Sequence, residues 1–270
     1  LRVIFPSYSS VFSDITGKTS IAILKKYSSP EAIINADRDE LINLISSNSR
    51  RGLANSEKTY KKLYDAAEEA VYIGLKSPSL FVKIINTISV IESLEIQIGN
   101  LLTEIHLLMN SNRISDEFKK NVQLLYSIPG VGELTAITIM SEIGNIKGFV
   151  KPKHLVAYFG LDPSVSQSGK FNSDRNVMSK RGTRIGRRAL YAVALASIRK
   201  NTNGEPINRV LLSFYNENMK GKSKKVGLVA IMHKLINYIF SVLKNQKEYE
   251  LRDPKIHSKM YLNTKSEQAA

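Results

Sequence analysis

Residues 80–110 constrain the fold more than any other stretch of this chain. Apolar side chains recur there at alternating steps of four and three residues, which is the repeat of a helix that presents one continuous seam. The seam has one polar member and runs through Ile84, Ile88, Ile91, Glu95, Ile98, Leu102, Ile105 and Met109. A chain that contains a helix of this length has to fold around it, so we expect a mainly α-helical protein.

Two partners can cover this seam. The helix can be a coiled-coil arm that joins two copies of the chain, which would make the protein a homo-oligomer through residues 80–110. It can equally form an antiparallel pair with a second predicted helix, Ser56 to Tyr72, which carries apolar side chains on one face. The sequence leaves both alternatives open.

The remaining helices are short, and capping residues mark where several of them begin. Ser29 followed by Pro30 is typical of a helix start, as is Asp37 before the next apolar run. We predict a helical bundle with a long coiled-coil-like helix and a C-terminal domain that contains a helix–hairpin–helix. The expected segments are a helical region and linker at 1–79, the long helix at 80–112, the C-terminal domain at 113–248 and a flexible tail at 249–270.

A glycine-rich turn between two amphipathic helices has the helix–hairpin–helix pattern. In Ile128-Pro129-Gly130-Val131-Gly132, the proline ends the first helix, and the glycines permit positive φ and close backbone approach. Hairpins of this kind bind the phosphate backbone through bare N–H groups at the second helix start and do not read bases. An ordinary tight connection between core helices is the alternative. Gly130 and Gly132 are therefore candidate nucleic-acid-binding residues.

The positive charge lies in the second half of the chain. Of the net +15, none comes from residues 1–110, which carry 12 Lys and Arg against 12 Asp and Glu; residues 111–270 carry 27 against 12. The window 170–225 alone has 14 cations and 3 anions. A cationic block attracts phosphate backbones because binding releases counterions. We therefore expect DNA as a partner. We expect no membrane, because no apolar run reaches membrane-spanning length.

A serine-rich loop precedes the most cationic part of the chain. Ser164, Ser166 and Ser168 occupy alternate positions, and Gly169 follows the last of them. A serine next to glycine on a loop can present its hydroxyl to a bulky electrophile, although most loop serines have no such role.

The helix after this loop supplies further candidates. It is predicted to run to about Lys200, with Arg181, Arg184 and Arg188 on one face. The opposite, apolar face is predicted to consist of Ile185, Ala189, Ala192, Val193 and Ala196. Guanidinium groups bind phosphate bidentately. The candidate phosphate-binding cations are Lys170, Lys180, Arg181, Arg184, Arg187 and Arg188.

No metal site or cofactor is predicted. The chain has no cysteine, and its histidines lack the spacing of metal ligands. They are His106, His154, His233 and His257. We expect His233 to be a core or surface histidine.

Taken in order, these motifs resemble one known family. They are Ile128 to Gly132, Phe159 to Pro163, Ser168-Gly169, Ser179 to Gly182 and Arg187 to Leu190. Their order is similar to that in the C-terminal domain of insertion-sequence transposases of the family numbered one hundred and ten, which are related to the Piv site-specific invertases. The resemblance is tight over residues 124–200 and looser in the helical region before them.

The resemblance implies a DNA recombinase that acts by transesterification. The family serine lies in the Ser-Gly motif and maps onto Ser168, whose hydroxyl would attack a DNA phosphodiester and form a transient phosphoserine link. A 3′-hydroxyl would then reseal the DNA, and neighbouring arginines would stabilise the pentavalent transition state. If Ser168 is not the nucleophile, Ser166 or Ser179 is the next candidate. Some members use a structured guide RNA, which adds RNA to the candidate partners.

Members of the family also carry an N-terminal RNase H-like (RuvC-like) domain with four acidic ligands for Mg²⁺. The acidic residues Asp14, Asp37, Asp39 and Glu40 do not match that quartet, and this chain begins with predicted helices. We therefore expect the metal-binding half to be absent, so that the chain alone binds DNA without cutting it. In a prokaryotic cell such a protein would be cytoplasmic and associated with the nucleoid.

Within the chain, we expect the hairpin, Ser168 and the arginines to form one composite site. Two other functions fit the same residues. The first is a catalytically inactive nucleic-acid-binding module that uses the hairpin and the arginine helix as a clamp. The second is a helical scaffold whose long helix mediates oligomerisation. Tight, salt-sensitive binding to DNA or RNA would argue against the scaffold.

Overall fold

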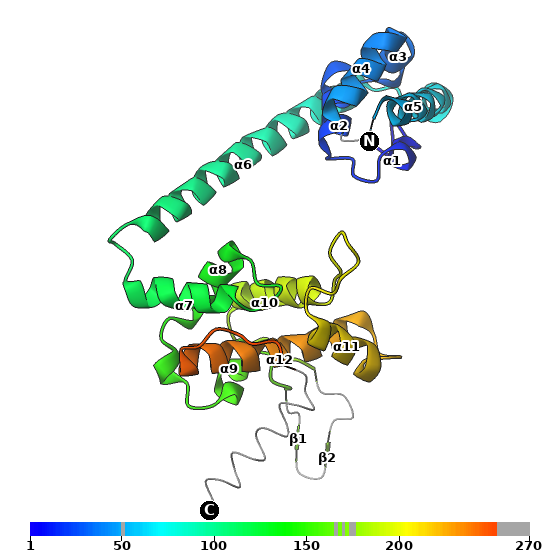
Figure 1. Ribbon diagram of the computed structural model, residues 1–270. Coiled ribbons are helices and arrows are strands. Elements are labelled where there is room, and N and C mark those ends of the chain that lie inside the picture. The colour runs from blue at the N-terminus through cyan, green and yellow to red at the C-terminus, as the bar shows by residue number, and fades with distance from the viewer. Residues whose placement is uncertain (50–51, 165–166, 169–170, 173–176, 253–270) are drawn as a thin grey trace, which may run out of the picture. The chain divides into compact units, whose positions relative to one another are not determined.

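A computed structural model of the chain is mainly α-helical, as predicted (Figure 1). It forms two compact units, Leu1–Leu107 and Leu108–Ala270, each with its own buried core. The structure describes residues 1–49, 52–164, 167–168, 171–172 and 177–252, with 167–168 and 171–172 described by their backbone alone.

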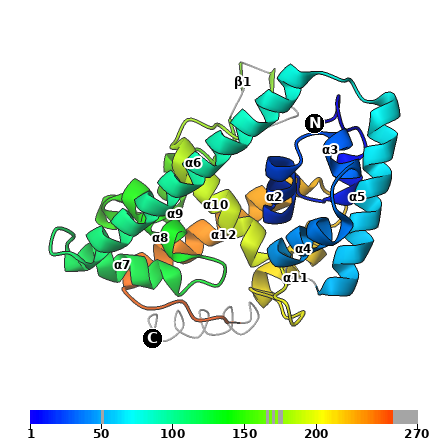
Figure 2. The ribbon, with the colours of Figure 1, turned by 90° about the horizontal axis from the view of Figure 1, so that it is seen from above.

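Five helices and the start of a sixth build the first unit. They are α1 Tyr8–Val11, α2 Lys18–Lys26, α3 Pro30–Ile34, α4 Arg38–Asn48, α5 Leu53–Ile73 and α6 Pro78–Asn110. The central helix is α5, because α1, α3 and α4 all pack against it, and Figure 2 shows α3 and α4 on the same side of it. The predicted caps are confirmed: the Ser29 side chain accepts a hydrogen bond from the Ala32 N–H, and Asp37 accepts one from the Glu40 N–H.

The long helix α6 confirms the helix predicted from the heptad pattern. Its first turns contact the first core through Ile84 and Ile88. Helix α5 packs mainly on α1, α3 and α4, which does not favour the alternative of an antiparallel pair between α5 and α6. Further along α6, apolar side chains stay exposed in the first unit: Leu94 is 51% and Ile98 56% exposed.

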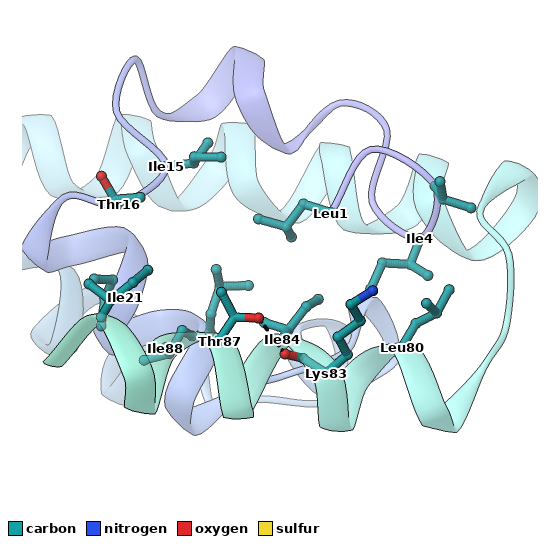
Figure 3. A pocket seen from close by; sticks show the side chains of 13 residues that line it. Leu1, Ile4, Ile15, Thr16, Ile21, Leu80, Lys83, Ile84, Thr87 and Ile88 are labelled. Atoms are coloured by element: carbon teal, nitrogen blue, oxygen red, sulfur yellow. Dashed lines mark hydrogen bonds between the residues drawn. The ribbon is translucent and has the colours of Figure 1, made fainter. Parts of the chain in front are cut away.

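An apolar cavity of about 320 Å³ lies between α6 and the chain before α3. Figure 3 shows Ile84 and Ile88 of α6 on one side of it and Leu1 and Ile15 on the other. The first turns of the seam therefore face the inside of the first unit.

The second unit is organised around its last helix. Its elements are α7 Asp116–Tyr126, α8 Glu133–Ile143, the 3-10 helix η1 Ile146–Gly148, α9 Pro152–Tyr158, β1 Gln167–Ser168, β2 Phe171–Asn172, α10 Arg184–Ser197, α11 Arg209–Asn218 and α12 Lys224–Asn245. Helices α7, α9, α10 and α11 all contact α12. The centre of the core consists of fully buried α12 side chains, namely Leu228, Ile231, Leu235, Ile236 and Ile239.

By length and composition, α12 could cross a membrane; it is the one helix in the described residues that passes this test. This corrects the expectation that no apolar run reaches that length. Half of its most apolar window is buried inside the unit. The hydrophobicity of α12 is therefore explained by its place in the core, since an apolar helix of this kind is typical of a buried core element.

The chain after α12 returns to α7. The Gln246 side chain donates to Asn121 Oδ1 at 2.8 Å, and the Tyr249 N–H donates to Ser127 Oγ at 2.8 Å. The centroid of the Tyr249 ring lies 4.9 Å from the centroid of the Tyr238 ring. The first residue of the predicted tail is thus held on the second core, and residues 253–270 lie outside the described chain.

Candidate nucleic-acid-binding surface

Three glycines bring the start of α10 against the end of α9. Gly160 follows the end of α9 with a φ of +63°, and a side chain there would lie 2.5 Å from the Gly182 nitrogen. A side chain at Gly182 would collide with the Tyr158 carbonyl oxygen, and one at Gly186 with the Phe159 ring. Since glycine alone avoids these collisions, the α9–α10 junction has one tightly packed arrangement.

Arg187 ties this junction together. Its Nη1 donates to the carbonyl oxygens of Phe159, at 3.1 Å, and Gly182, at 2.6 Å. The residue is half-buried, and hydrogen bonds from a charged donor are stronger than neutral ones. Arg187 therefore has a structural role that its sequence pattern did not indicate, and its predicted contact with phosphate stays a prediction.

The chain segments before and after the serine loop pair with each other and form a stem. The Ser164 N–H donates to the Val177 carbonyl at 2.7 Å, and the Ser179 N–H donates to the Asp162 carbonyl at 2.8 Å. The Ser179 hydroxyl adds a hydrogen bond of 2.6 Å to Asp162 Oδ1. The loop that carries Ser168 therefore starts and ends in an ordered stem.

Ser168 itself lies in β1. The pairing of β1 with β2 is antiparallel and places Ser168 opposite Phe171. Ser166 and Lys170 lie outside the described residues. The assignment of Ser168 as nucleophile and of Lys170 as a phosphate ligand stays a prediction.

Four of the predicted cations form an exposed group where the stem meets α10. They are Lys180, Arg181, Arg184 and Arg188, which we call the array. No described carboxylate lies within the 4.0 Å ion-pair distance of any of them. Lys180 has a left-handed φ of 56°, and its N–H donates to the Gly160 carbonyl at 3.0 Å. The backbone at Lys180 is thus held in place, and the side chains of the array are open to solvent.

The start of α10, which carries the array, is anchored to α8. The Thr183 side chain caps α10 by accepting a hydrogen bond from the Gly186 N–H at 3.2 Å, and its hydroxyl also donates to the Glu142 carboxylate. Glu142 accepts a further bond at its backbone carbonyl, from the Tyr158 hydroxyl at 2.7 Å. One residue of α8 therefore joins α9 and α10.

The inward face of α10 differs from the predicted one. Its buried residues are Gly186, Leu190, Val193, Ala194 and Ser197. Of the predicted apolar face, Val193 is buried, whereas Ile185 is 58% exposed and Ala192 is exposed. The packing of Gly186 against Phe159 sets the rotation of the helix, and this contact has no apolar signature in the sequence.

The two hairpin glycines have different surroundings. Gly130 has a φ of +103°, and a side chain there would collide with Ser197. The Ser197 hydroxyl in turn donates to the Pro129 carbonyl at 3.2 Å. Gly132 is exposed, with nothing within 4 Å of an added side chain, and it begins α8 without a side-chain cap. Gly130 thus serves packing, while Gly132 lies at the surface and gives α8 no side-chain cap.

Helix α10 separates the hairpin from the array. Ser197, its last residue, contacts Gly130, whereas the array surrounds its first residue, Arg184. Thirteen residues at 1.5 Å each place the two about 20 Å apart along the helix. The expected composite site is therefore two sites: the array and the serine stem lie at one end of α10, and the hairpin lies at the other.

The described residues offer no metal site. No group of three or more His, Asp or Glu among them is close enough to hold an ion. The described acidic residues therefore do not form a binding site for the Mg²⁺ that the resemblance implies. No chemical step is assigned to a metal. His233 is half-buried, and its Nε2 lies 3.1 Å from the Leu161 carbonyl oxygen. A ring N–H there would donate to the carbonyl and hold the Leu161 turn.

Comparison with known proteins agrees with these features. Residues 122–207 match the sequence model of the Transposase IS116/IS110/IS902 family. This segment contains the array, the serine stem and the hairpin. The predicted relationship to the C-terminal domain of these insertion-sequence transposases is therefore confirmed.

Individual relatives extend the match. A 43.6 kDa protein of insertion element IS110 from Streptomyces coelicolor is 25% identical over 86% of this chain and 53% of its own length. A pilin gene-inverting protein from Moraxella bovis is 30% identical over 50% of this chain and 41% of its own. The transposase of element IS1111A from Coxiella burnetii is 31% identical over 48% of this chain and 35% of its own. The chain thus spans about half the length of these relatives, or less.

Proposed function

We propose that this chain acts in DNA transposition or recombination, with the second unit binding the DNA backbone and Ser168 acting as the nucleophile. The observation that carries the proposal is the array, because four exposed cations without ion pairs to described carboxylates stand at the base of the loop that contains a Ser-Gly pair. The relatives named as transposases and gene-inverting proteins support the same class of reaction.

The geometry of the array suits phosphate binding. Arg184 and Arg188 are one helical turn apart, so both can reach one stretch of backbone. Guanidinium groups bind phosphate oxygens in a bidentate manner. Since glycine packing and the Thr183 cap hold the start of the helix that carries them, the backbone of α10 does not have to reorganise when a phosphate binds.

The proposed reaction has two balanced steps. In the first, Ser168 Oγ forms a bond to phosphorus while the bond from phosphorus to the 3′ oxygen breaks, and the serine proton ends on the released 3′-hydroxyl. In the second, a 3′-hydroxyl of another strand attacks the phosphoserine, and Ser168 recovers its proton. Cations beside the phosphorus stabilise the charge that develops in both transition states.

DNA binding by this chain is the first test. A labelled duplex is titrated with the chain at several salt concentrations, and the double variant Arg184→Ala/Arg188→Ala is compared with Lys61→Ala/Lys62→Ala on exposed positions of α5. We expect the affinity for DNA to decrease as the salt concentration rises. In the array variant alone, the slope of log affinity against log salt concentration should decrease by the amount that corresponds to about two phosphate contacts. Failure of the parent chain to bind DNA at low salt would overturn the proposal.

The nucleophile requires a separate test, because the chain alone is expected to bind DNA without cutting it. In a version that spans the full length of its relatives, Ser168→Ala should abolish recombination and Ser166→Ala should not. Recombination that survives Ser168→Ala would move the role to Ser166 or Ser179. If no full-length version recombines DNA while binding persists, the chain is the catalytically inactive clamp.

The exposed side of α6 supports a homo-oligomer as part of this proposal. Leu94 and Ile98 lie on successive turns and are more than half exposed, as expected for a helix that meets a second copy. Sedimentation of Leu94→Lys/Ile98→Lys should show a smaller species than the parent chain. A monomeric parent at micromolar concentration would remove the oligomer from the proposal and leave DNA binding in place.

A further inference from the structure

The solvent side of α10 continues beyond the array as one strip of side chains. Arg184, Arg188 and Tyr191 are all exposed, and at about 3.6 residues per turn they lie within about 60° of one another around the helix axis. Tyr191 is 38% exposed, although its ring is large and mostly apolar. The two arginines are therefore followed, one turn along the same face, by an aromatic ring that reaches solvent.

The Tyr191 ring has no aromatic or cationic partner within the described chain. No described ring pairs with it, and no described cation lies over its face. Tyr158 differs, because its ring packs on Phe149 and Phe159 and its hydroxyl donates to the Glu142 carbonyl. The exposed part of the Tyr191 ring is therefore available to a ligand.

Packing on the other side of α10 fixes the rotation that exposes this strip. A side chain at Gly186 would collide with the Phe159 ring, so the helix lies directly on that ring. Leu190 and Ala194 are fully buried in the second core. The helix cannot turn Tyr191 inward without exposing them, so the core itself holds the aromatic ring in line with the array.

Arginine and tyrosine in one line suit a nucleotide whose base is unpaired. Guanidinium groups bind phosphate oxygens, and a tyrosine ring stacks on the face of a base. In an intact duplex each base face is covered by its neighbours, and a protein reaches phosphates, sugars and base edges. Stacking on Tyr191 therefore requires a base that has left the duplex.

The spacing along α10 fits one nucleotide. Tyr191 lies about 4.5 Å along the helix axis from Arg188. A DNA strand advances about 3.4 Å per nucleotide. A phosphate bound by Arg188 and a base stacked on Tyr191 can therefore belong to the same nucleotide or to adjacent ones.

We propose that Tyr191 stacks on an unpaired DNA base next to a phosphate held by Arg188, so that α10 binds a locally opened duplex more tightly than an intact one. The inference rests on the proposed function and deepens it by naming the form of the DNA. The proposed reaction accounts for such a base. A 3′-hydroxyl of another strand replaces the one that left, so nucleotides beside the exchanged phosphate have to change pairing partners, and an aromatic surface stabilises them while they are unpaired.

A matched pair of DNA substrates tests this inference. The 270-residue chain is titrated with a duplex and with the same duplex that carries a short unpaired bulge on one strand. The parent chain should bind the bulged DNA about 5- to 140-fold more tightly, which is the range for one stacked base. In Tyr191→Leu the two affinities should become equal, because leucine is apolar but has no ring face. Tyr191→Phe keeps the ring and should keep the preference.

Two further measurements separate stacking from other effects. A fluorescent base analogue, 2-aminopurine, at the unpaired position should be quenched by the parent chain and by Tyr191→Phe, and less by Tyr191→Leu. Tyr72→Leu is the matched control, because Tyr72 is 88% exposed on α5 of the first unit; it should leave the preference unchanged. Equal thermal unfolding of the parent chain and Tyr191→Leu excludes a loss of fold as the cause.

The outcomes distinguish this inference from the proposed function. If the parent chain binds both DNAs equally and Arg184→Ala/Arg188→Ala weakens both, the stacked base is wrong and the array stands. If Tyr191→Leu weakens the duplex and the bulged DNA by the same factor, the preference for an unpaired base is wrong. If the preference appears only with a bulged RNA, the assignment to DNA is wrong. If the parent chain binds neither DNA at low salt, the proposed function fails as well.

Discussion

Ser197 lies directly against Gly130: its Cα is 3.1 Å from the position where a side chain at residue 130 would begin, and its hydroxyl donates to the carbonyl of the preceding Pro129. This contact joins the hairpin to the end of α10. It also explains why one of the two hairpin glycines is needed for packing while the other stays at the surface.

The first prediction concerns this packing glycine. Gly130→Ala forces a side chain into a positive φ and against the Ser197 backbone, so we expect a loss of about 2 to 4 kcal/mol in the stability of the second unit. Hydrogen exchange at the amides of α7, α8 and α10 measures the loss. Gly144→Ala is a useful comparison, because it shares the positive φ but has open space around it. Equal losses at the two positions would show that the Ser197 contact contributes nothing.

A substitution of Gly132 should raise the stability of the second unit, in contrast to Gly130→Ala. Gly132→Ser supplies the missing cap of α8 at a position with free space, so stability should rise by a few tenths of a kcal/mol. The same hydroxyl would occupy the N–H groups that the hairpin pattern assigns to phosphate, and DNA affinity should fall. Denaturation and DNA titration of one variant check both signs. A variant with raised stability and unchanged affinity would remove the start of α8 from the DNA surface.

The sequence predicted the parts of this surface better than their arrangement. Local signals were sufficient for α6, for the helix starts at Ser29 and Asp37 and for the turn into α8, because each depends on residues close together in the chain. The Asp162–Ser179 bond and the packing of Gly182 on Tyr158 join residues 17 and 24 positions apart. No local pattern marks such contacts, so the inward role of Arg187 and the rotation of α10 became clear only in the folded chain.

Substitutions of Arg187 and Arg188 should have different effects, although the two residues are neighbours in the sequence. A change at Arg187 should lower the stability of the fold, and a change at Arg188 should weaken DNA binding. Arg187→Ala removes two hydrogen bonds to carbonyl oxygens and should cost about 1.5 to 3 kcal/mol. Arg188→Ala, at an exposed position, should change stability by less than about 0.5 kcal/mol and should weaken DNA binding. Arg187→Lys keeps the charge and part of the bonding, so its stability should be intermediate. If Arg188→Ala destabilised the fold as much as Arg187→Ala, the division of roles would be wrong.

The last prediction concerns alkaline pH and the segment after α12. Burial raises the pKa of Tyr238 and of Tyr249 above the ordinary value of 10.0. The folded state therefore holds both phenol protons more tightly than the unfolded state does. Their contribution to stability is intact below pH 10 and decreases as the pH rises above 10 toward the pKa values of the folded state. Stability should consequently fall above pH 10.

Tyrosine-to-phenylalanine variants isolate this effect. Burial also raises the pKa of Tyr8 in the first unit, so the parent chain alone cannot assign the alkaline loss to one unit. The thermal midpoint should fall less steeply between about pH 9.5 and 11 in Tyr238→Phe/Tyr249→Phe than in the parent chain, while Tyr8→Phe affects the first unit only. Identical slopes for the parent and Tyr238→Phe/Tyr249→Phe would mean that the segment carrying Tyr249 does not keep its place on the second core.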